Sequence, residues 1–174
     1  MTSLPTRPKP HEFEPAPHLI PAAVGTVAER SFFAFVCNGE DPEFYDSVPE
    51  WFEATVKFDD GPVSGSLVCW LPCDLALLLY DAFSGRDPAT ALPPHHEVDD
   101  LVGEFANMVC GTWLTRCATK RAFRLSRPEV TRVRQPEADP GSRQWLLVND
   151  RPLAIDWDVD ERTDDPGRPH QASV

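Results

Sequence analysis

A glutamate and an asparagine lie three positions apart near the middle of the chain, at Glu104 and Asn107. If this segment is helical, the spacing places both side chains on one face, about one turn apart. A carboxylate pairs with cations, and a carboxamide both donates and accepts hydrogen bonds. Side chains of these types on one helix face could form ion pairs and hydrogen bonds with a partner that approaches closely.

Two more residues, Asp100 and Gly111, fall on the same line of the helix as Glu104 and Asn107. Asparagine is a mediocre helix former, and glycine in a helix interior costs about 1 kcal/mol relative to alanine. The glycine would leave bare backbone beside Asn107, where a partner could approach closely. Acidic residues alone are also common on an ordinary solvated helix face, so the asparagine and the glycine carry the functional interpretation.

We call this line of four residues, Asp100, Glu104, Asn107 and Gly111, the stripe. It belongs to a segment with the pattern of one long helix, over residues 96–120. The segment follows a pair of prolines, and its first turn is rich in acidic residues, which favour the helix dipole. Apolar residues recur on the face opposite the stripe, as in a helix packed on a core. That core face consists of Val98, Val102, Phe105, Val109 and Trp113, flanked by Leu101, Ala106 and Met108.

Patterns along the rest of the chain predict an α+β domain. Helices are predicted over 22–36 and over 73–83, the second closed by a Ser-Gly pair. A β-hairpin is predicted over 52–71, with Gly65 in its second strand. Three further strands are predicted over 123–125 running into 129–134, over 144–148 and over 153–157. Since no βαβ alternation is present, we expect long helices packed on a mostly antiparallel sheet.

The chain of 174 residues is expected to form one domain between two tails. Prolines crowd residues 1–18, which predicts a Pro-rich disordered arm. Acidic residues and few apolar ones mark 158–174, which predicts an acidic disordered tail. The folded body is therefore predicted over 19–157.

Charge and composition exclude several classes of function. Asp and Glu total 28 against 16 Lys and Arg, for a formal net charge of -12, so a nucleic-acid partner is disfavoured. No apolar run is long enough to span a bilayer and no secretory signal is evident, so we expect a cytoplasmic protein without a membrane partner. The 5 cysteines are expected to be free thiols, and their spacing predicts no metal site.

The residues 99–111, DDLVGEFANMVCG, resemble the signature helix of the CheC/CheX chemotaxis phosphatases. That pattern is Asp or Ser, three residues, Glu, two residues, Asn, and then an apolar stretch and Gly. Asp100, Glu104, Asn107 and Gly111 occupy these places, and Pro128 supplies the family's downstream proline slightly early. Because the chain has a single Glu-x-x-Asn site, it is more similar to the CheX-like branch, and a CheX/CheC-like fold is implied.

The resemblance implies hydrolysis of the aspartyl phosphate of a CheY-type response regulator. Asn107 would hold the attacking water, and Glu104 would pair with the active-site lysine of the phosphorylated receiver. Asp100, Gly111 and Pro128 would help to dock the partner. The Mg²⁺ ion of such a reaction belongs to the receiver, so no cofactor of the chain's own is expected. The resemblance also implies a homodimer formed through the sheet.

Two other interpretations stay open at this point. The same helix could serve a non-catalytic module that binds a receiver domain in a motility or two-component signalling assembly. The chain could also be an unrelated α+β domain with a chance motif. The presence of both Glu104 and Asn107 favours catalysis, because a surface used only for binding has no need of a water-holding amide. No Ser/His/Asp, Cys/His, P-loop or metal constellation suggests a different enzyme.

Overall fold

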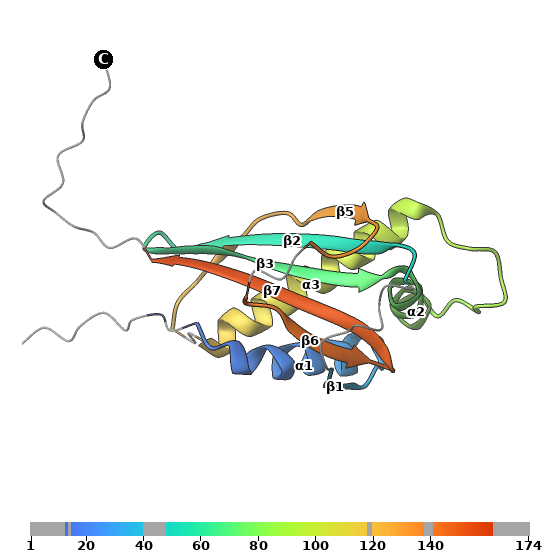
Figure 1. Cartoon of the computed structure of the whole chain (residues 1–174), viewed down its shortest axis with the longest axis horizontal. Helices are drawn as coiled ribbons and strands as arrows, with labels where there is room; N and C mark the ends of the chain where they lie inside the picture. The colour runs from blue at the N-terminus through green and yellow to red at the C-terminus, as the bar shows by residue number, and fades with distance from the viewer. Residues whose placement is uncertain (1–12, 14, 40–47, 118–119, 138–140, 162–174) are drawn as a thin grey trace, which may run out of the picture.

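A computed structural model describes residues 13, 15–39, 48–117, 120–137 and 141–161 (Figure 1). Within these ranges the chain forms three α-helices, a short 3-10 helix and seven strands of one sheet. The helices are α1 (Ile20–Phe32), α2 (Cys73–Ser84) and α3 (His95–Cys117), preceded by the 3-10 helix η1 (Pro17–Leu19). In the described part of the chain, no helix is both long and apolar enough to cross a membrane.

The sheet is antiparallel at every pairing of the described strands. Its order is β1-β6-β7-β3-β2, and β4 and β5 both pair with the outer edge of β2. The predicted α+β class with a mostly antiparallel sheet is confirmed. The strands are β1 (Val36–Asn38), β2 (Trp51–Asp59), β3 (Val63–Pro72), β4 (Arg124–Leu125), β5 (Glu129–Val133), β6 (Gln144–Val148) and β7 (Arg151–Glu161).

The first predicted helix, over 22–36, is wrong at its C-terminal end. Helix α1 ends at Phe32 because Phe33 adopts a left-handed conformation with φ 52°. The following residues form β1, which pairs with β6 at the edge of the sheet. The local sequence does not predict this helix end, since the left-handed position carries a phenylalanine rather than the usual glycine.

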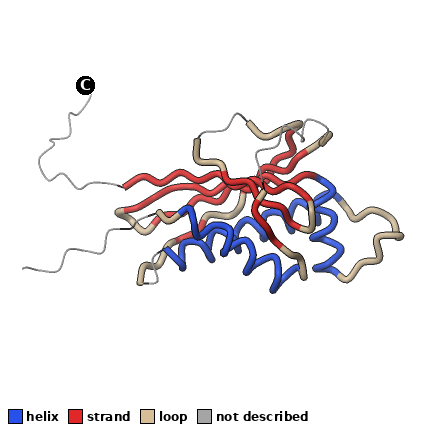
Figure 2. Tube along the Cα trace, turned by 60° about the horizontal axis from the view of Figure 1, so that its bottom comes forward, coloured by secondary structure: helices blue, strands red, loops and turns tan. Residues whose placement is uncertain are grey.

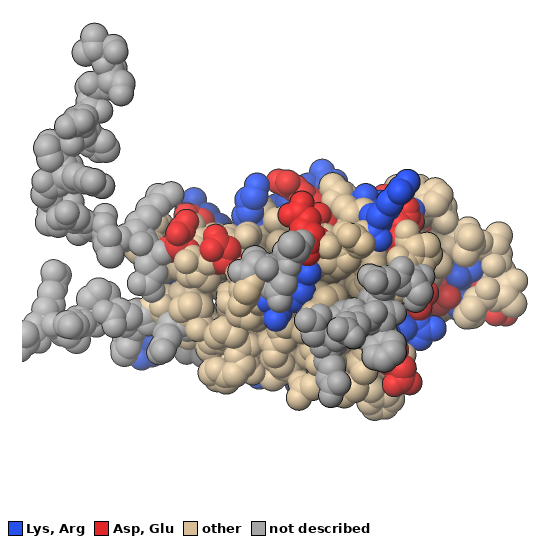
Figure 3. All heavy atoms as spheres, in the orientation of Figure 1, with Lys and Arg blue, Asp and Glu red and all other residues tan. Residues whose placement is uncertain are grey.

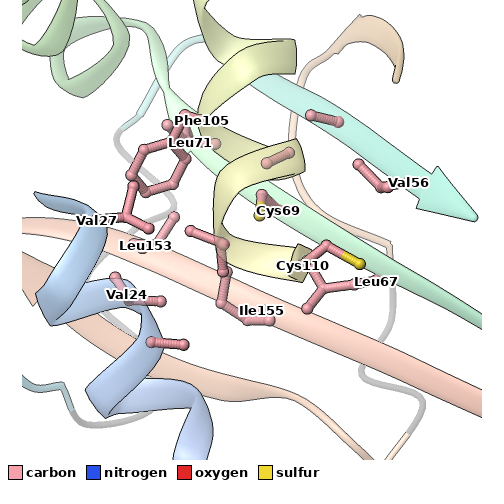
Figure 4. Packing of buried hydrophobic residues seen from close by; sticks show 14 of the residues in the cluster. Val24, Val27, Val56, Leu67, Cys69, Leu71, Phe105, Cys110, Leu153 and Ile155 are labelled. Atoms are coloured by element: carbon pink, nitrogen blue, oxygen red, sulfur yellow. The ribbon is translucent and has the colours of Figure 1, made fainter. Parts of the chain in front are cut away.

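All three α-helices cover the same face of the sheet (Figure 2). Side chains from α1 and α3 meet those of β3 and β7 in the core, with Phe105 and Cys110 of α3 between the layers (Figure 4). The strands contribute alternate residues to this core, as expected for a sheet with one covered face. The largest fully buried core side chains include Trp113, Phe32, Phe52, Phe58 and Phe105.

The opposite face of the sheet carries a smaller cluster and a buried ion pair. Trp51, Trp70 and Ala154, which alternate with core residues along their strands, form the cluster. On the same face Arg143 and Asp156 are joined at 2.7 Å, with side chains only 5% and 11% exposed. Elsewhere basic and acidic side chains lie next to one another over the strands rather than in separate patches (Figure 3).

The predicted domain boundaries are wrong at both ends. Strand β7 continues to Glu161, and its last residues, 158–161, pair with 63–66 of β3. The acidic composition led to the wrong prediction of a disordered tail from residue 158, because strand pairing uses the backbone. The side chains of Asp158 and Asp160 are exposed to solvent and do not oppose the pairing. At the other end Phe13, inside the predicted arm, is 3% exposed and packs edge-on against Phe123 at 5.3 Å. The rest of the predicted arm and tail lies outside the described residues, apart from 15–18.

Gly65 explains how β3 and β7 pair at this end. A Cβ added at Gly65 would lie 2.2 Å from the Asp158 carbonyl oxygen and 2.6 Å from the Phe58 ring. Both distances are far shorter than any real contact of a Cβ atom, so a side chain here would push the strands apart. The glycine therefore permits the close backbone approach that continues β7 beyond the predicted body.

Candidate functional site

Helix α3 presents two different faces, as its sequence predicts. The predicted core residues Val98, Val102, Phe105, Val109 and Trp113 are all at most 4% exposed. Asp100 and Glu104 are exposed, and Asn107 and Gly111 are half-buried. The four stripe residues therefore share one face of the helix. This face is exposed to solvent in the N-terminal half of the helix and partly covered in the C-terminal half.

The cover over Gly111 comes from β4. A Cβ added at Gly111 would be in ordinary contact with Leu125 Cδ1, at 3.6 Å. Leu125 thus partly fills the bare patch predicted beside Asn107. The sequence alone could not predict this contact, because only the fold brings Leu125 next to Gly111. Docking of a partner on Gly111 stays a prediction.

Asn107 has a buried carbonyl oxygen that is not used within the described chain. Its Oδ1 atom is shielded from solvent and has no hydrogen-bond partner among the described residues. Burial of an acceptor without a partner costs about 1–3 kcal/mol, and such groups are explained by strain, by a catalytic role or by a bound water or ion. Among the described residues, Gln144 Oε1 is in the same situation, so it is the position of Asn107 one turn from Glu104 that makes it the candidate.

A shallow hollow lies beside the N-terminal half of the stripe. Asp99, Asp100, Gly103 and Glu104 form its helical wall. The other wall consists of Arg127 and Pro128, from the segment joining β4 to β5, and of Val130 in β5. The two walls meet closely at Gly103, where an added Cβ would lie 3.2 Å from Pro128 Cβ and 3.3 Å from Val130 Cγ2. A glycine at this position thus brings Pro128 next to the stripe.

Other contacts fix the start of α3. The Arg132 guanidinium donates to Asp99 at 2.9 Å, lies 3.7 Å from Glu50 and covers the Phe52 ring at 4.7 Å. The hydrogen bond with Asp99 raises the pKa of Arg132, which is charged in any case. Asp99 is thereby neutralised, whereas Asp100 and Glu104 have no ion pair with any described residue and stay available.

A second contact ties α3 to α2. The Tyr80 hydroxyl donates to the Glu97 carboxylate, and this hydrogen bond raises the pKa of Tyr80. The N-terminal half of α3 is therefore held from two sides, by α2 and by β5. The carboxylate of Glu104 is carried by a helix that cannot shift easily against the sheet.

Sulfur and metal chemistry find no support near the stripe. Each of the five cysteines is a free thiol, and burial raises the pKa of Cys110 on α3 to about 12. A thiol of this kind is protonated at neutral pH and is a poor nucleophile. Within the described ranges no three His, Cys, Asp or Glu side chains gather as a metal-binding group.

The structure also brings residues to the site that the sequence did not single out. Gly103, Arg127 and Val130 line the hollow together with the predicted Asp100, Glu104 and Pro128. The sequence could have indicated Gly103, because a glycine in the middle of a helix destabilises the helix, and Gly111 was singled out for the same reason. Arg127 could not be indicated in this way, since its place next to the helix depends on the long-range packing of Pro128.

Three helices on one face of an antiparallel sheet form a fold that the chain shares with solved structures of CheX- and CheC-like chemotaxis proteins. The chemotaxis protein CheX from Vibrio vulnificus has the same fold, with a TM-score of 0.63 and 17% identity over 82% of this chain and 95% of that one. A putative chemotaxis protein from Desulfovibrio vulgaris Hildenborough matches with a TM-score of 0.60 and 16% identity over 82% of this chain and 95% of that one.

The family model described as chemotaxis phosphatase CheX matches residues 52–148, and the chain belongs to this family. The matched region contains the whole stripe and Pro128, so the resemblance seen in the sequence is confirmed. CheX in the CheX-CheY-BeF3-Mg²⁺ complex from Borrelia burgdorferi shares the fold at a TM-score of 0.58 and 11% identity, covering 86% of this chain and 100% of that one. No curated protein matches the chain.

Proposed function

We propose that this protein hydrolyses the aspartyl phosphate of a CheY-type chemotaxis response regulator, with Asn107 holding the water and Glu104 docking on the receiver's lysine. The observation that carries the proposal is that two groups lie one turn apart on one face of α3 and that neither has a partner among the described residues. One is the buried carbonyl oxygen of Asn107, and the other is the exposed carboxylate of Glu104. Membership of a chemotaxis phosphatase family supports it.

An acyl phosphate can be hydrolysed without a nucleophile from the phosphatase. A water oxygen attacks phosphorus in line, the bond from phosphorus to the aspartyl oxygen breaks, and inorganic phosphate and the free aspartate carboxylate are released. The enzyme's task is to place the water, which an amide can do because it accepts a hydrogen bond from water and carries no charge to repel the phosphoryl group. The Mg²⁺ ion belongs to the receiver in this scheme.

Glu104 supplies the docking contact. Its carboxylate has no ion pair with a residue of the described ranges, and it would bind the active-site lysine of the receiver and set the register of the helix on that surface. Asp100, Gly111 and Pro128 would support this docking from the same side. The CheX-CheY complex from Borrelia burgdorferi, a neighbour in fold, supports a receiver partner of the CheY type. A homodimer formed through the sheet remains part of the proposal.

The test is the decay rate of a phosphorylated chemotaxis receiver from the same organism, measured with and without a substoichiometric amount of the protein. Faster decay with several turnovers per molecule is the expected result. Unchanged decay across the organism's chemotaxis receivers, despite measurable complex formation, would contradict the proposal and leave a receiver-binding module without catalysis.

Glu104→Gln should lower kcat/KM about tenfold or more, because an interface that loses one charge of a close pair loses affinity and register. The melting temperature should stay within about 1 °C of that of the parent protein, since the side chain is exposed and unpaired. Glu29→Gln, an equal change on the exposed surface of α1, is the matched control. Equal activity of the two variants would remove Glu104 from the site.

A further inference from the structure

Arg127 stands out in the hollow beside Glu104. It is exposed and has no hydrogen bond or ion pair with a described residue, although Asp99, Asp100 and Glu104 line the same hollow. The neighbouring arginine, Arg132, is in the opposite situation because Asp99 and Glu50 neutralise it. Arg127 is therefore a permanently charged cation on the wall opposite these carboxylates, and no described residue pairs with it, so it can bind an anion from a partner.

The backbone on both sides of Arg127 is fastened to the fold. On one side the Ser126 amide donates to the Lys57 carbonyl oxygen at 2.8 Å, and the Lys57 amide donates to the Ser126 hydroxyl at 3.0 Å. On the other side Pro128 packs on the bare backbone of Gly103. A cation whose anchor is already ordered loses little conformational freedom when it binds, which favours a specific contact over a diffuse one.

Arg127 lies beside the N-terminal half of the stripe on α3, away from Asn107, the residue proposed to hold the attacking water. It shares the hollow with Asp100 and Glu104, whereas Asn107 lies one turn further towards the C-terminus and does not line it. A positive group there would meet the rim of a docked receiver rather than the reacting phosphoryl group. Together Arg127 and Glu104 present a positive and a negative charge side by side.

We propose that Arg127 is a specificity-determining residue that binds a carboxylate on the receiver surface, next to the lysine engaged by Glu104. The inference rests on the proposed function and refines it. The preferred partner carries a lysine and an acidic side chain as neighbours, a pattern complementary to Glu104 and Arg127. A receiver that has the lysine without the neighbouring carboxylate docks more weakly.

Three variants test the proposal: Arg127→Glu, Arg127→Lys and the control Arg30→Glu. Arg30 is an exposed residue of α1 without an ion pair to a described residue, so its replacement changes the net charge by the same amount. Arg127→Glu should raise KM for the phosphorylated receiver about tenfold and leave kcat within about twofold, because a rim charge acts on association. Arg127→Lys should lie between parent and Arg127→Glu, and Arg30→Glu should match the parent.

Titration of the unphosphorylated receiver at low and high salt gives a second readout that needs no turnover. The affinity loss of Arg127→Glu should be about tenfold at low salt and should shrink as salt screens the contact. Equal affinities of Arg127→Glu and Arg30→Glu would overturn the proposal. A fall in kcat at unchanged affinity would overturn it too, since it would assign Arg127 to the phosphoryl group.

The two readouts separate this inference from the function on which it rests. If the parent protein binds the receiver but does not speed its dephosphorylation, the phosphatase proposal fails while the titration still decides the role of Arg127. If the parent protein speeds dephosphorylation and the Arg127 variants behave like the control, only the role of Arg127 is lost. A parent protein that neither binds nor dephosphorylates any receiver would overturn both.

Discussion

Replacing Asn107 by alanine should reduce the stimulated dephosphorylation of the receiver by about 100-fold or more, because the water would lose the group that positions it. The free energy of unfolding should stay within about 0.5 kcal/mol of the parent value or rise, because the change breaks no hydrogen bond of the Asn107 carbonyl with the part of the chain that the structure describes. The measurements are the receiver's decay rate and urea unfolding of the same preparation. The expected signature is lost turnover in a protein of undiminished stability.

Asn107→Asp is the companion variant. It keeps the shape of the side chain but places a carboxylate where the buried carbonyl oxygen lies, which repels a phosphoryl group and is costly to bury. We expect it to be inactive and, unlike Asn107→Ala, less stable than the parent at neutral pH. An alanine variant that unfolds would show that the asparagine is structural, and one with parent-like turnover would exclude it from the mechanism.

The second large effect concerns stability on the face of the sheet away from the helices. Asp156 accepts hydrogen bonds from Arg143 Nε and Nη2, at 2.9 and 2.7 Å, and from Trp70 Nε1 at 2.9 Å. Asp156→Ala should lower the free energy of unfolding by about 3 kcal/mol, because it leaves a nearly buried guanidinium without its counter-charge. Urea unfolding monitored by tryptophan fluorescence measures the change.

Two comparisons make this expectation specific. Glu129→Ala breaks the ion pair of Lys57 and Glu129, whose side chains are 63% and 69% exposed, and should change the free energy of unfolding by less than about 0.5 kcal/mol. The double change Arg143→Met with Asp156→Leu should recover much of the stability lost by Asp156→Ala, since no uncompensated charge remains. Equal losses for Asp156→Ala and Glu129→Ala would show that the buried pair contributes no more than a surface one.

The sequence predicted the elements wherever a regular apolar pattern repeats over several turns or strand residues. The faces of α3, the hairpin of β2 and β3, and the helix closed by Gly85 agree with the structure for this reason. Strand β1 escaped prediction because it has only 3 residues at the sheet edge, too few for a pattern. The end of β7 escaped because an acidic, solvated strand is held by backbone pairing, which composition does not reveal.

The site was partly predictable for a related reason. Asp100, Glu104, Asn107 and Gly111 share one helix, so spacing alone places them on one face. The position of Leu125 over Gly111, the hollow with Arg127 and the neutralisation of Asp99 by Arg132 depend on contacts between distant parts of the chain. Such contacts follow from how β4 and β5 join the edge of β2, and no local pattern encodes them.

Glu104 and Asn107 belong to one unbroken helix of 23 residues, and this continuity has a mechanical consequence. Three helical residues advance about 4.5 Å along the axis, so the two backbone positions keep a constant separation unless the helix unwinds. Under the proposed function, this constant separation sets the spacing that a partner's lysine and phosphorylated aspartate must match. If Arg127 selects the partner as proposed, changes in the segment around it would alter partner choice without altering the spacing of Glu104 and Asn107, so recognition and chemistry could evolve separately.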